Sequence, residues 1–100
     1  MRQPKTDSEL TEEIQKAERA KQLIKDPMIT KAIMEMRDIC YHNIRTSHHS
    51  KKDEREDLYY MLRAIDRFEE YFKSLIVTGK KATEKLKIRS QGIEHEQMKG

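Results

Sequence analysis

The chain of 100 residues has no tryptophan, one cysteine, two prolines and three glycines. A single cysteine, Cys40, excludes an internal disulfide and is typical of a reducing compartment. No run approaches about 18 uninterrupted apolar residues, so the sequence predicts no membrane span and no membrane partner. The N-terminus, MRQPKTDSEL, lacks the apolar segment of a secretory signal. We therefore expect the chain to be cytoplasmic at synthesis.

Charged residues are abundant instead. They make up 39% of the chain, against 35% for the hydrophobic set, which is typical of solvated helices within one small domain. The net charge of +3 lies at one end: residues 1–26 carry six basic and six acidic groups, residues 27–78 nine of each, and residues 79–100 six against three. The neutral body is unlike a domain that binds nucleic acid over its whole surface.

Residues 53–78 form the most strongly patterned stretch of the chain. Their apolar residues recur at steps of three and four, which predicts one continuous stripe along a helix. An acidic first turn suits the positive end of the helix dipole, and Gly79 is interpreted as the C′ residue that ends the helix. The stripe consists of Leu58, Met61, Leu62, Ile65, Phe68, Phe72, Leu75 and Ile76.

Two further helices are predicted upstream, over residues 8–25 and 27–45. Thr6-x-x-Glu9 fits a capping box for the first helix. Asp26 and Pro27 are suited to the N-cap and N1 positions of the second. The polar stretch of residues 46–52 then predicts a turn into the third helix.

These elements predict an all-α fold with a long antiparallel helical hairpin, a short N-terminal helix and a basic C-terminal segment. We expect a helical domain over residues 1–79 and a partly helical or mobile tail over residues 80–100, with a mobile end at 92–100. Ridge-and-groove packing should bring Ile33, Met36 and Cys40 against the third helix. Because a lone hairpin buries little surface, its open side must be covered by the first helix, a second copy of the chain or a partner. We expect self-association through the same apolar residues, together with some contribution from the first helix.

No catalytic, metal or cofactor site is predicted. Cys40 and His42, two residues apart on a helix, point to different faces and cannot form a nucleophile–base pair. His48 and His49 lack the further ligands that a tetrahedral zinc site needs. The chain is therefore predicted not to be an enzyme.

The basic segment after Gly79 leaves two binding interpretations open. Its cations could contact the phosphates of a nucleic acid, in a salt-dependent manner, or an acidic protein surface. The same residues are also explained by a solvated tail that binds nothing. Nucleic acid is not favoured, because the cluster of basic residues is small. The candidate contacts are Lys80, Lys81, Lys85, Lys87 and Arg89.

The motif AERAKQLIKDP (residues 17–27), a helix, a polar turn and LRAIDRFEEYFKSLIVTGKKA (residues 62–82) together resemble a known group. They are similar to small helical proteins that tailed bacteriophages encode in their head and packaging gene clusters. The resemblance covers roughly residues 15–90 and implies a non-enzymatic, virion-associated or assembly component. It also implies self-association and contact with a larger phage structural protein. It carries no motif from which a site residue can be transferred.

The sequence thus predicts a structural or accessory protein that works by protein binding, as a homo-oligomer. Two alternatives remain: a nucleic-acid-binding accessory that uses the basic tail, and a small inhibitor of a host protein. Fold alone does not separate these functions.

Overall fold

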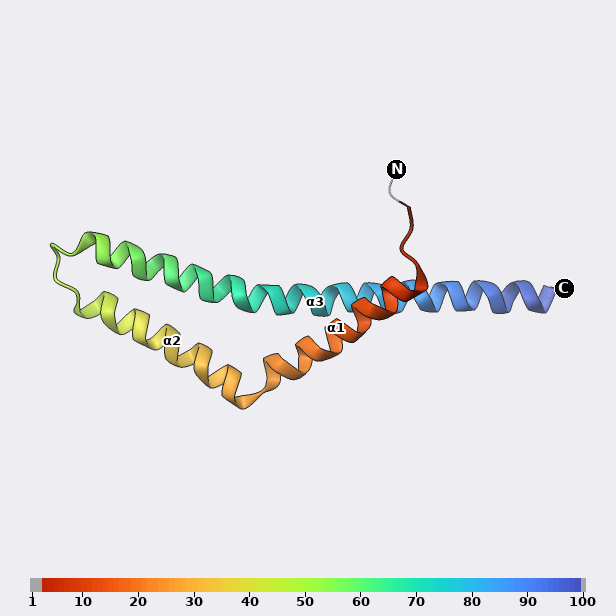
Figure 1. The fold of residues 1–100 in the computed structure, drawn as a ribbon, viewed down its shortest axis with the longest axis horizontal. Helices are drawn as coiled ribbons and strands as arrows, with labels where there is room; N and C mark the ends of the chain where they lie inside the picture. Colours follow the sequence, from red (N-terminus) through yellow and green to blue (C-terminus); the bar gives the residue numbers. More distant parts are fainter. Residues whose placement is uncertain (1–2, 100) are drawn as a thin grey trace. The chain divides into compact units, whose positions relative to one another are not determined.

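The computed structural model describes the backbone of residues 3–99 and the side chains of residues 3–92. It contains three helices, α1 (Asp7–Lys25), α2 (Pro27–Thr46) and α3 (Lys52–Lys99), and no strand within the described residues (Figure 1). The predicted all-α fold is confirmed. The chain divides into two units: one combines residues 1–21 with residues 72–100, and the other is formed by residues 22–71.

Both predicted helix starts are confirmed by their capping contacts. The Thr6 hydroxyl oxygen accepts a hydrogen bond from the backbone N–H of Glu9 at 3.1 Å and donates to the Glu9 carboxylate at 3.2 Å. At the start of α2, the Asp26 carboxylate accepts a bond from the N–H of Met28 at 2.8 Å, and Pro27 occupies the first turn. These side chains satisfy backbone donors that have no partner inside the helix.

The unit of residues 22–71, hereafter the hairpin unit, places α2 antiparallel to the first half of α3 (Figure 1). Its buried cluster is small, and partly buried Ile29, Ile44 and Leu58 pack around it. Arg55 fastens the turn: its guanidinium donates to the backbone oxygens of His48 and His49 at 2.6 and 3.0 Å. The cluster consists of Ile33, Cys40, Leu62 and Ile65.

The prediction that Gly79 ends the third helix is wrong. α3 continues through Gly79 to Lys99, and no described glycine has a positive φ. The basic residues 80–90 are therefore a continuation of the same helix. The mobile end predicted at residues 92–100 falls mostly on side chains outside the described range.

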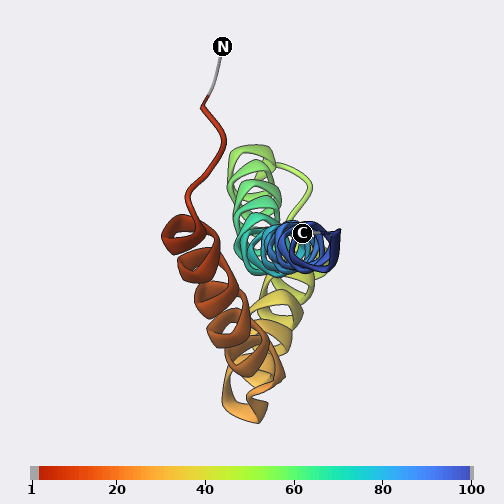
Figure 2. The same ribbon diagram turned by 90° about the vertical axis from the view of Figure 1, so that its right-hand side faces the viewer.

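Gly79 has a packing role in place of a capping role. A Cβ atom built on Gly79 would lie 2.1 Å from the Cβ of Ala17 and 3.3 Å from the backbone oxygen of Glu13. Ala20 and Ala82, each about 1% exposed, continue this row of small residues. The missing side chain lets α1 approach the backbone of α3 closely, and Figures 1 and 2 show these two segments side by side.

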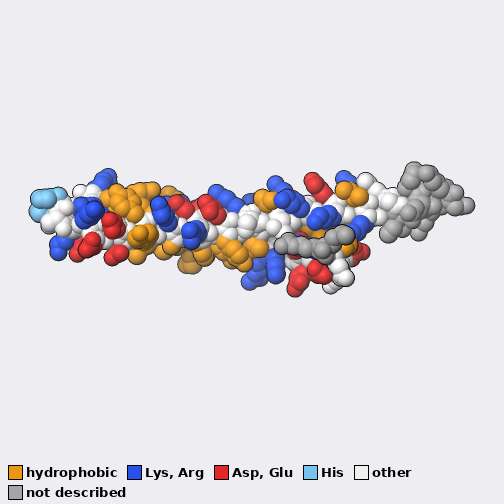
Figure 3. Space-filling view, turned by 90° about the horizontal axis from the view of Figure 1, so that it is seen from above, with side chains coloured by type: hydrophobic (Ala, Val, Ile, Leu, Met, Phe, Trp, Pro, Cys, Tyr) orange, Lys and Arg blue, Asp and Glu red, His pale blue; other side chains and the backbone are white. Residues whose placement is uncertain are grey.

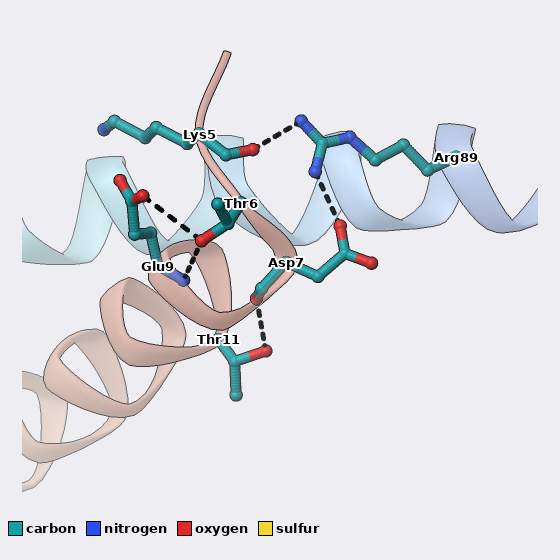
Figure 4. A network of polar contacts seen from close by, with 6 residues as sticks. All are labelled: Lys5, Thr6, Asp7, Glu9, Thr11 and Arg89. Carbon is teal, nitrogen blue, oxygen red and sulfur yellow. Dashed lines mark hydrogen bonds and ion pairs between the residues drawn. The ribbon is translucent and has the colours of Figure 1, made fainter. Parts of the chain in front are cut away.

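A polar network joins the start of the chain to α3 (Figure 4). Arg89 donates to the Asp7 carboxylate at 2.6 Å and to the backbone oxygen of Lys5 at 2.8 Å. The Lys5 ammonium pairs in turn with Glu13, which lies six residues after Asp7 in α1. Arg89 thus holds the first turn of α1 against α3.

Candidate interaction surfaces

The structure divides the predicted core residues into three groups. Ile33, Leu62 and Ile65 are buried. Leu58, Phe72, Leu75 and Ile76 are half-buried. Met36, Met61 and Phe68 are 44%, 54% and 47% exposed, so they add little to the core of one chain.

One side of the hairpin unit, hereafter the methionine face, carries large side chains without polar groups. At the turn, this side borders a groove that is lined by Leu58 and Met61 and by the polar residues Asn43, Ser47, Glu54 and Asp57. Met36 and Ile39 lie seven and four residues before Asn43, on the same side of α2. Phe68 lies seven residues after Met61, on the same side of α3. Met36, Ile39, Met61 and Phe68 constitute the face, and Ile39 is 60% exposed.

A second groove in the hairpin unit is lined by tyrosines and charged residues. Tyr41, Tyr59 and Tyr60 border it and are 51%, 53% and 64% exposed, with Arg63 and Asp66 beside them. Figure 3 shows hydrophobic side chains interspersed with charged ones near the histidine-bearing turn. Tyrosine hydroxyls remain satisfied in water, so this groove is less costly to expose than the methionine face.

Arg37 joins α2 to α3 through two ion pairs. Its guanidinium lies 2.8 Å from the Asp66 carboxylate and 2.5 Å from that of Glu69. The hydrogen bond to Asp66, together with the negative charge of Glu69, raises the pKa of Arg37 above its ordinary value, although partial burial offsets some of this rise. The arginine therefore stays charged at physiological pH, and the two pairs fix how α2 is aligned along α3.

Replacing Arg37 by methionine should lower the free energy of unfolding by about 1 kcal/mol, because both ion pairs are partly solvated. Urea denaturation followed by circular dichroism measures the effect. Lys31→Met is the matched control, since Lys31 and Glu35 form an exposed pair at 3.9 Å. Equal losses in the two variants would show that Arg37 is an ordinary surface charge.

The basic segment is only partly available to an external partner. Arg89 is half-buried and holds Asp7, so it contributes to the fold of its own unit. The side chains of Lys80, Lys81, Lys85 and Lys87 are all exposed. The sequence could not distinguish Arg89 from the lysines, because its partner Asp7 lies 82 residues away in the chain.

The cysteine and the two turn histidines were the remaining candidates for a chemical site. Cys40 is a buried free thiol in the hairpin core. His48 and His49 stack in the turn, and the described residues include no group of three His, Cys, Asp or Glu side chains that could hold a metal ion. Among the described helices, none combines the length and apolar character that crossing a membrane requires.

Comparisons of the chain with protein-family models, with curated proteins and with solved structures found no match. The similarity to phage head and packaging proteins therefore stays a prediction. Any functional conclusion has to come from the surfaces of the chain itself.

Proposed function

We propose that the chain is a non-enzymatic assembly protein that associates with a second copy of itself through the methionine face. The observation that carries this proposal is the distribution of exposed apolar side chains. Of the twelve large hydrophobic side chains exposed in the described residues, ten lie within residues 22–71. The hairpin unit therefore exposes most of the apolar surface that a partner could remove from water.

The hairpin unit leaves much of its apolar surface in contact with water. The four side chains of the methionine face are 44–60% exposed, and a partner would remove that surface from water. The buried cluster of the hairpin unit holds four residues, which is a small core for two helices.

A second copy is the favoured occupant because it needs only one self-complementary patch. In a two-fold dimer the same surface of each chain meets its counterpart, so one apolar face is covered in both copies at once. The methionine face suits this role better than the tyrosine groove. Its four side chains carry no hydrogen-bonding group and gain only by leaving water.

Light scattering on the full-length chain tests the association. We expect at least twice the mass of one chain at both low and high salt, because an apolar contact is not weakened by screening. Met61→Glu should reduce the mass to that of a monomer and retain the helical circular dichroism. Tyr60→Glu, an equal change at the neighbouring and more exposed residue, is the control and should leave the oligomer intact.

A wild-type monomer at tens of micromolar would refute self-association. An unchanged oligomer in Met61→Glu would refute the assigned face alone. If both expectations hold, the phage resemblance extends the proposal to a virion or assembly component that also contacts a larger structural protein. The inhibitor alternative has no specific observation in its favour.

A further inference from the structure

A row of lysines occupies the exposed side of α3 in the unit that contains α1. Lys73, Lys80 and Lys87 recur every seven residues, which is close to two helical turns, so they align along the helix at steps of about 10.5 Å. Lys81 and Lys85 widen the row on one side. These five residues are hereafter the lysine face, and all of their side chains are exposed.

Most of the lysine face lies away from α1. At about 3.6 residues per turn, Lys73, Lys80 and Lys81 lie at least about 100° around α3 from both Gly79 and Ala82, the small residues on the side that α1 covers. Lys85 and Lys87 lie nearer to the two edges of that side. Three of the five acidic residues of α1 have ion-pair partners outside the lysine face: Asp7 pairs with Arg89, Glu13 with Lys5 and Glu18 with Lys21.

The charge of the lysine face is only partly compensated by its own helix. Glu70 lies one turn before Lys73, and Glu84 lies between Lys80 and Lys87. Residues 72–92 contain no other acidic residue, against five lysines and the internally engaged Arg89. None of the five lysines lies within an ion pair with another described residue. A regular array of exposed ammonium groups therefore concentrates positive potential along one side of the helix.

We propose that the lysine face binds the phosphate backbone of a nucleic acid, without sequence preference. Phosphates form a regular ladder of negative charge, and flexible ammonium groups contact such a ladder as point charges. An acidic protein is the less suitable ligand. Of the face's described neighbours, the exposed apolar residues are Val77 and Ile88, and the face has no aromatic side chain to anchor a protein interface.

Fluorescence anisotropy with a labelled duplex DNA of arbitrary sequence tests this inference on the full chain. If all five lysines contact phosphates, the plot of log affinity against log salt should have a slope of about −4.5. Binding should then weaken about 500-fold between 50 and 200 mM salt, which follows from the same slope. A second duplex of different sequence should bind with equal affinity.

A triple variant, Lys73→Gln with Lys80→Gln and Lys87→Gln, removes the central row. Its slope should fall to about −1.8, so that the same change in salt weakens binding only about twelve-fold. The matched control replaces Lys25, Lys31 and Lys52 by glutamine, which lowers the net charge equally at exposed sites of the hairpin unit. The control should keep the wild-type slope.

Three results would overturn the inference: no binding at 50 mM salt, an equal loss in the control variant, or competition by polyglutamate at the same charge concentration as DNA. The last would identify an acidic polypeptide as the ligand class. This test is independent of the Proposed function, because Met61→Glu removes the methionine face and leaves the lysine face unchanged. A wild-type chain that is monomeric and binds DNA as described would refute self-association and support the lysine face.

Discussion

Replacing Gly79 by leucine should unfold the unit in which α1 packs on α3. The Cβ atom alone would lie 2.1 Å from the Cβ of Ala17, far inside the separation of about 3.5–4.0 Å at which carbon atoms attract each other. The two helices must therefore move apart and expose Leu10, Ala20 and Ala82, which are now buried. We expect a loss of about 3 kcal/mol and a fall in Tm of roughly 10 °C or more by circular dichroism.

Gly79→Ala separates packing from helix propensity. Alanine is favoured over glycine inside a helix by about 1 kcal/mol, yet the same contact with Ala17 should make this variant less stable than the wild type. Adding Ala17→Gly removes the opposing Cβ and should restore much of the loss. The control is Gly92→Ala, which meets nothing within 4 Å and should be stabilising. Stabilisation by Gly79→Ala would contradict the close approach of the helices.

The helices and their starts could be predicted because their signals are local. Thr6 and Glu9 lie within one turn of each other, as do Asp26 and Met28, and each pair acts through hydrogen bonds that spacing alone determines. The stripe that includes Ile65 has a helical period regardless of what covers it. Such features need no knowledge of the rest of the fold.

The role of Gly79 could not be predicted from its neighbours, because glycine serves two incompatible purposes. It ends helices in a left-handed conformation, and it also permits close contact within a helix. The choice here depends on Ala17, which is distant in sequence. Similarly, the stripe shows that Met61 and Phe68 lie on an apolar side of α3, but not that the chain leaves them 54% and 47% exposed.

Replacing Ile65 by aspartate should unfold the hairpin unit. Ile65 is 6% exposed and belongs to a cluster with Ile33, Cys40 and Leu62, none of which can pair with a carboxylate. Burying an unpaired charge costs several kcal/mol, and the lost isoleucine contributes about 2–3 kcal/mol more. Because the buried cluster has only four members, the unit has no other core to retain its structure. We expect a large loss of helical circular dichroism at neutral pH.

Ile39→Asp introduces the same group on the methionine face and separates folding from association. Ile39 is 60% exposed, so a carboxylate there remains hydrated in a single chain and helicity should be retained. In a dimer that covers this face, the same carboxylate would be buried against the apolar side chains of the second copy. Light scattering should therefore find a folded monomer for Ile39→Asp. If both variants unfold, the methionine face is part of the core; if Ile39→Asp stays folded and oligomeric, the chain associates through another surface.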